Sequence, residues 1–133
     1  MSCKSAIYTV NADVAVAEGG TIPLGSIVRR YGSCIDLNGN GVTLSESGSY
    51  HVAVSVTAEP TTAGPISIDL LQDGNPVPGA VASGVAAAAG DPVPLAFTAL
   101  VRLACRCSGS NLTVRLLEGG SNIANVALVA ERI

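Results

Sequence analysis

The chain has 133 residues, a formal net charge of −3, and only 13% charged residues, about half the usual share. The length fits one domain and excludes a multidomain enzyme. The low charge excludes an ordinary disordered chain, which is polar and highly charged. Because the sequence has no basic cluster and no run of roughly 18 apolar residues, we expect neither a nucleic-acid partner nor a membrane partner. The N-terminus shows no secretion signal, so we expect synthesis in a cytoplasm.

Turn-forming residues recur at short intervals and separate runs that are rich in Val, Ile, Leu and Thr. This pattern is typical of an all-β sandwich or barrel. About ten short strands in two antiparallel sheets predict a single jelly-roll domain over residues 1–133. The expected strand segments are 5–10, 13–17, 21–30, 33–37, 42–45, 49–58, 66–72, 80–88, 93–106, 111–117 and 122–132.

Several of these segments alternate apolar and polar residues, as a half-buried antiparallel strand does. In 50–57, for example, Tyr50 and Val52 share an apolar face, whereas Ser55 and Thr57 lie on the other face. The turn at 38–41, Asn-Gly-Asn-Gly, predicts a hairpin because these residues tolerate positive φ. It lacks the ligand spacing and the closing Glu of a calcium loop.

Two segments, 6–10 and 123–130, are apolar on both faces. An antiparallel strand of this kind has a second cover beyond the core, which is either a loop folded over it or another subunit. We favour a subunit interface, because the second face of 50–57 is also small and only lightly polar. The expected interface residues are Ile7, Tyr8, His51, Ala53, Ser55, Val126 and Leu128.

Residues for catalysis are sparse. His51 is the single histidine and lies in an expected strand, no Gly-x-Ser-x-Gly elbow presents a serine, and the acidic residues are scattered singly. We therefore expect no enzymatic activity, no cofactor and no metal site. Arg29 and Arg30 form a solvated strand edge or contact an acidic partner. Three further arginines lie on the polar faces of neighbouring strands, where they pair with Asp69 or Glu118 or line a subunit boundary: Arg102, Arg106 and Arg115.

Four cysteines allow three disulfide pairings: Cys3, Cys34, Cys105 and Cys107. Cys105 and Cys107 are two residues apart on an expected strand and point to the same face, which disfavours a bond between them. Buried thiols, disulfides formed after release, and a metal site are the open alternatives. The metal alternative is the weakest, because the Cys-x-x-Cys spacing is absent and His51 is the only nitrogen ligand to add.

Two stretches carry a family resemblance. Residues 48–56, GSYHVAVSV, followed by residues 66–80, ISIDLLQDGNPVPGA, resemble the C1q/TNF-like jelly rolls, in the variant found in bacteria and phages. Residues 125–132 are similar to the final strand of that fold. The resemblance implies a homotrimer in which the sheet with the first and last strands lies near the three-fold axis.

No Gly-X-Y stalk precedes the first expected strand, unlike in the collagen-like spore-surface members. We therefore expect a non-enzymatic homotrimer that decorates or stabilises a phage capsid at the virion surface. Its partners would be its own copies and a major capsid or other virion protein, with residues 1–5 as a docking arm. The alternative is a receptor- or glycan-binding tip module of a phage fibre or of a bacterial cell or spore surface.

Overall fold

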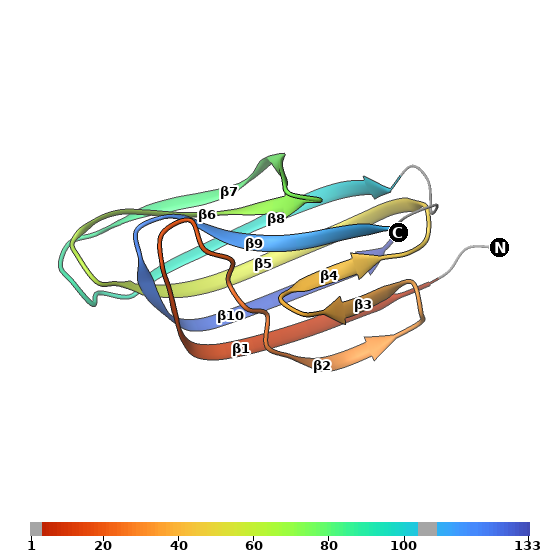
Figure 1. The fold of residues 1–133 in the computed structure, drawn as a ribbon, viewed down its shortest axis with the longest axis horizontal. Coiled ribbons are helices and arrows are strands. Elements are labelled where there is room, and N and C mark those ends of the chain that lie inside the picture. Colours follow the sequence, from red (N-terminus) through yellow and green to blue (C-terminus); the bar gives the residue numbers. More distant parts are fainter. Residues whose placement is uncertain (1–3, 104–108) are drawn as a thin grey trace.

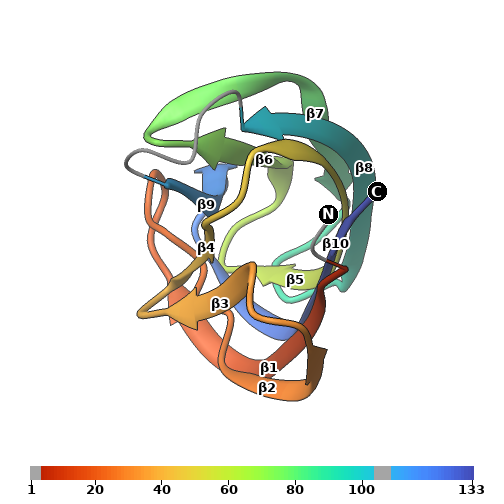
Figure 2. The same ribbon diagram turned by 90° about the vertical axis from the view of Figure 1, so that its right-hand side faces the viewer.

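A computed structural model describes residues 4–103 and 109–133. These residues form two antiparallel five-stranded sheets, a first sheet in the order β2-β1-β10-β5-β8 and a second in the order β3-β4-β9-β6-β7 (Figure 1). The sheets face each other in a sandwich (Figure 2), which confirms the predicted jelly roll. The strands are β1 (Ala6–Val16), β2 (Ser26–Tyr31), β3 (Ile35–Asn38), β4 (Gly41–Leu44), β5 (Gly48–Pro60), β6 (Gly64–Gln72), β7 (Asn75–Ala86), β8 (Val93–Leu103), β9 (Ser110–Glu118) and β10 (Ser121–Arg132).

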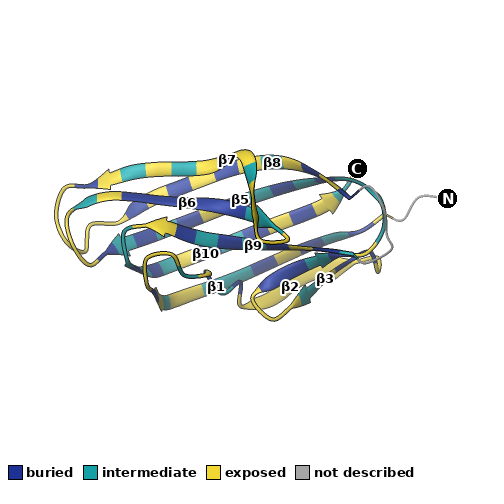
Figure 3. Ribbon diagram, turned by 45° about the horizontal axis from the view of Figure 1, so that its top comes forward, coloured by how far each residue is buried: buried dark blue, intermediate teal, exposed yellow. Residues whose placement is uncertain are grey.

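The core lies between the two sheets and is filled mainly by Val, Ile, Leu and Ala. Burial alternates along most strands (Figure 3), with every second side chain turned inward. In β5 the inward residues from Tyr50 to Val56 are at most 2% exposed, as the sequence alternation predicts. β6 differs, because Ser67 and Asp69 on its other face are also buried, at 7% and 5% exposed.

The first and last strands each change their inward residues partway along. In β1, Asp13 has a φ of 52° and lies between two paired residues, so the expected segments 5–10 and 13–17 are one strand with a local irregularity. In β10, the pairing with β5 shifts by one residue between Ile123 and Asn125. Such a bulge moves the following side chains to the opposite face. Ile123 is therefore buried before the bulge and Val126 after it.

Residues 17–25 do not belong to the first sheet, although the sequence predicted a strand from residue 21 to residue 30. They cross to the second sheet and run beside the end of β9, where Gly19 N donates to Leu116 O (2.7 Å) and Ile22 N donates to Val114 O (2.8 Å). Ile22 and Leu24 are at most 1% exposed and fill this end of the core. The crossing thus occupies the edge that short β4 leaves open, since β4 pairs with β9 only up to Leu112.

Two tight hairpins have the turn chemistry that their sequences predict. Gln72 pairs with Asn75 across Asp73 and Gly74, whose φ values of 52° and 84° are both positive, as a type I′ turn requires. The predicted hairpin at 38–41 is confirmed, with Asn38 paired to Gly41. These turns set the register of their strands, and hence which residues face outward.

Burial of Tyr50 leads to a pH-dependent prediction. Its phenol donates a 2.5 Å hydrogen bond to Glu46 O, and burial raises the pKa of Tyr50 above its ordinary value of 10.0. Above pH 10 the unfolded chain ionises while the folded chain keeps its proton, so Tyr50 stabilises the fold less as pH rises. We expect Tyr50→Phe to cost about 1 kcal/mol at pH 7, with a gap to wild type that narrows between pH 9 and pH 11. Urea unfolding followed by circular dichroism measures this gap.

The matched control is Tyr31→Phe, because Tyr31 is 59% exposed. At pH 7 its gap to wild type should be smaller than that of Tyr50→Phe. A Tyr50→Phe gap that stays constant from pH 9 to pH 11 would contradict the assignment.

Candidate functional site

The outer face of the first sheet is the candidate functional surface. Cross-strand pairing arranges its outward side chains in four rows from β1 through β10 and β5 to β8. The four rows are Ala6–Glu131–His51–Leu100, Tyr8–Val129–Ala53–Thr98, Val10–Ala127–Ser55–Ala96 and Ala12–Asn125–Thr57–Pro94. The last three rows hold no acidic or basic side chain, so the middle of this face is both small and almost free of charge.

A shallow groove of about 770 Å³ lies along the middle of this outer face. Its floor is low because three neighbouring strands each contribute alanine or serine at the same level. Larger apolar side chains stand at its side, and Tyr8 and Val129 are still 38% and 36% exposed. The lining residues are Tyr8, Ala53, Val54, Ser55, Ala96, Phe97, Thr98, Asn125, Ala127 and Val129.

Four of the expected interface residues lie together on this face: Tyr8, His51, Ala53 and Ser55. The other three, Ile7, Val126 and Leu128, are at most 1% exposed and point into the core. They are therefore not available to the outer face. The outward residues of the same strands are Tyr8, Ala127 and Val129, which alternation alone could not distinguish from their equally apolar neighbours.

Within residues 4–103 and 109–133, the exposed apolar side chains on this face argue against a covering loop. Leu100 is 65% exposed, and Tyr8 and Val129 remain partly open. β2 continues the face at one edge, where Arg29 lies beside Tyr8 and Tyr31 lies beside Ala6. The described part of the chain thus leaves the second apolar face open.

Of the four rows, the one that contains Glu131 and His51 is the charged row, and beyond the opposite end of the set Glu59 of β5 accepts a hydrogen bond from Asn122 Nδ2 (2.9 Å). The His51 Nδ1 atom lies 3.5 Å from Glu131 Oε1, and the two side chains are 41% and 51% exposed. The neighbour of His51 on β8 is Leu100. In the part of the chain that the structure describes, no three His, Cys, Asp or Glu side chains gather as a metal site would require.

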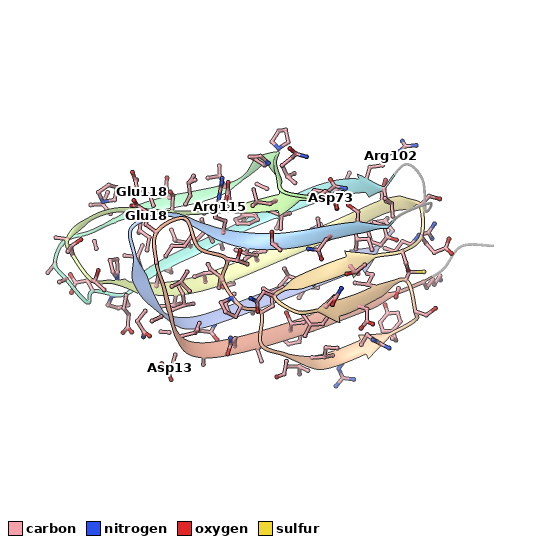
Figure 4. The ribbon with its side chains drawn as sticks, viewed as in Figure 1. Asp13, Glu18, Asp73, Arg102, Arg115 and Glu118 are labelled. Carbon is pink, nitrogen blue, oxygen red and sulfur yellow. The ribbon has the colours of Figure 1, made fainter. Side chains whose placement is uncertain are left out.

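The second sheet carries its own charged pair. Arg115 on β9 holds both carboxylate oxygens of Asp69 on β6, at 3.0 Å from Nε and 2.6 Å from Nη2. The bond to Asp69 raises the pKa of the Arg115 guanidinium. Glu18 and Glu118 lie near one another toward one end of the sandwich (Figure 4), and Glu18 Oε1 accepts a bond from Gly119 N. The predicted pairing of Arg115 with Asp69 is therefore present and is a bidentate contact.

Asp73 lies toward the other end of the sandwich (Figure 4), at a small polar hollow of about 280 Å³. Its carboxylate accepts bonds from Ser110 Oγ (2.7 Å) and Asn111 N (2.9 Å). These bonds tie the β6–β7 turn to the start of β9. The acidic group of the hollow thus already holds the fold together.

Cys34 is buried and disulfide-bonded, and its backbone N donates to Ser5 Oγ. The other three cysteines, Cys3, Cys105 and Cys107, lie outside the described residues. Arg106 lies outside them as well.

Arg30, from the sequence pair Arg29-Arg30, binds Asp36 at 2.5 Å in an exposed pair. The described residues contain no helix long and apolar enough to cross a membrane.

No family model and no curated protein sequence matches the chain. Solved structures do match over nearly the whole length. Murine APRIL has a TM-score of 0.77 at 11% identity, covering 98% of this chain and 99% of its own. The globular domain of zebrafish complement 1qA has a TM-score of 0.71 at 12% identity, covering 96% and 95%. The PRD1 vertex protein P5 has a TM-score of 0.68 at 11% identity, covering 100% and 99%. The chain therefore has the C1q/TNF-like jelly-roll fold.

The Asp69–Arg115 pair provides a stability prediction. The Asp69 side chain is only 7% exposed, so Arg115→Met leaves a buried carboxylate without its partner and lowers the free energy of unfolding. Replacing both members, in Asp69→Leu/Arg115→Met, should recover most of that loss, because two apolar side chains need no compensation. Urea unfolding of the single and double variants measures both effects.

The control is Arg30→Met, which breaks an exposed pair worth under about 1 kcal/mol. We expect a smaller loss of stability than in Arg115→Met. If the double variant is no more stable than Arg115→Met, burial of the Asp69 carboxylate is not the cause of the loss.

Proposed function

We propose that the protein is a non-enzymatic structural protein that forms a homotrimer and decorates or stabilises a phage capsid surface. The observation that carries the proposal is the outer face of the first sheet. Between β1 and β8, its last three rows hold no acidic or basic side chain, and a groove of alanine and serine runs along them. A soluble chain that leaves such a face open in isolation is suited to cover it with another protein.

A second copy of the same chain is the proposed occupant. The face is apolar but shallow, which suits packing against a neighbouring strand face or edge better than the enclosure of a small ligand. At about 25 cal/mol per Å², burying several hundred Å² of apolar surface per chain is sufficient to hold an oligomer before association costs. Closed cyclic symmetry ends the assembly at a fixed number of copies, and the family resemblance favours three.

The virion role draws on different support. The PRD1 vertex protein P5 shares the fold over the whole of this chain, so this jelly roll occurs among phage structural proteins. The capsid partner, the docking arm at residues 1–5 and the virion-surface location belong to this proposal.

The trimer is tested by a matched pair of serine substitutions. Ser55→Glu introduces a carboxylate into the centre of the groove, whereas Ser83→Glu adds one to exposed β7 in the second sheet. Because a buried unpaired charge is strongly unfavourable, we expect Ser55→Glu to weaken the trimer by at least about 100-fold. Ser83→Glu should remain trimeric. Sedimentation velocity over a concentration series measures both.

Circular dichroism checks that both variants keep the wild-type fold. A wild-type chain that is monomeric at micromolar concentration contradicts the proposal. A folded Ser55→Glu variant that is as trimeric as wild type shows that the trimer uses another surface.

The capsid role is tested by immunogold electron microscopy of phage particles from the source that makes this chain. We expect gold at regular positions over the capsid surface and a fixed copy number per particle by quantitative mass spectrometry. Label confined to fibre tips would favour the receptor-binding alternative, and unlabelled particles would contradict a virion role.

A further inference from the structure

The ionisable pair His51 and Glu131 lies at one end of three rows that carry no acidic or basic side chain. The two residues are cross-strand neighbours in the row that also contains Ala6 and Leu100. The adjoining row has Val129 and Ala53 in the same strands, and neither carries charge. A second copy packed on this face would therefore cover one carboxylate and one imidazole per chain at the margin of an apolar contact.

The geometry lets the two groups respond to one another. His51 Nδ1 lies 3.5 Å from Glu131 Oε1, and both side chains are still partly exposed, at 41% and 51%. On β8 the direct neighbour of His51 is Leu100, and the nearest charged residue is Arg102, which pairs with Ser49 and is diagonal to His51. On the other side, Ala6 lies opposite Glu131, and the continued register, in which Arg132 N donates to Ser5 O, places the exposed Lys4 diagonal to Glu131. Glu131 is thus the charged group that directly faces His51.

We infer that protonation of His51 strengthens the homotrimer, which makes assembly of this protein pH-sensitive. The inference rests on the proposed function, because it requires the outer face to be covered by other copies. With His51 neutral, covering the face removes water from the Glu131 carboxylate while its directly facing neighbour carries no charge. With His51 protonated, the two side chains form an ion pair with no net charge.

The direction follows from proton linkage. The covered state favours the protonated imidazole over the neutral one, so the trimer binds more protons than the separate chains. Histidine is the side chain that ordinarily changes its charge between pH 5 and 8. The trimer should therefore be stabilised as pH falls from 8 to 6 and weakened as pH rises. Arg102 opposes protonation of His51, but only across the longer diagonal spacing and at an exposed position.

The test measures trimer dissociation by sedimentation velocity at pH 6.0, 7.0 and 8.0, with wild type and two substitutions. For wild type we expect a dissociation midpoint that shifts by about tenfold or more in concentration between pH 6.0 and 8.0, toward tighter assembly at pH 6.0. His51→Gln should show no such shift and should resemble wild type at pH 8.0. Glu131→Gln should assemble more tightly than wild type at pH 8.0, because the uncompensated carboxylate is gone.

Glu118→Gln is the matched control, since it removes an exposed carboxylate from the second sheet. It should keep the wild-type pH dependence. A wild-type trimer whose dissociation is unchanged from pH 6.0 to 8.0, or a His51→Gln variant that keeps the shift, contradicts this inference alone. A chain that is monomeric at every pH contradicts both this inference and the proposed trimer.

Discussion

The two-residue period of the β-strand is the constraint on which the rest of this structure depends. It divides the side chains of the first sheet into an inward set that fills the core and an outward set that meets the surroundings. In β5 the inward set is large and apolar, and the outward set includes Ala53 and Ser55. Because neighbouring strands contribute Ala127 and Ala96 at the same level, the outward set forms a groove instead of a charged surface.

Which side chains are buried can be predicted from the sequence only where a strand has one apolar face and one polar face. Where polar and apolar residues alternate, as in β5, the sequence identified the buried side chains correctly. In β1 and β10 both faces are apolar. The pattern therefore indicates that these strands have a second covered face, but it does not tell which of the two faces points into the core. Alternation therefore cannot show that Ile7 and Leu128 lie in the core and not on the outer face. The bulge in β10 also reverses the alternation within one strand, so the residues before it do not predict which residues after it are buried.

Other features depend on contacts between distant segments, which local patterns do not contain. Asp69 has the alternation of an exposed residue, yet it is 5% exposed because Arg115 from β9 lies against it. Residues 21–25 belong to the segment 21–30 that the sequence predicts as one strand, but short β4 leaves an edge of β9 open, and the chain crosses there to bury Ile22 and Leu24. Turn chemistry is local by contrast, and the hairpins at 38–41 and 72–75 follow from their Gly-Asn and Asp-Gly loop residues.

The structure shows where the few charged residues of the chain lie and which surface they leave uncharged. A chain with few charged residues does not necessarily have an uncharged sheet face, because charged residues usually lie at exposed strand positions. Here Arg115 and Asp69 form an ion pair with each other in the second sheet, and Arg30 and Asp36 form a pair between β2 and β3. On the outer face, three successive rows carry no acidic or basic side chain, and Glu131 and His51 lie side by side in the row that adjoins them. Because the pair lies at the margin of this neutral surface, a change in its charge with pH does not disturb the apolar packing at the centre of the surface.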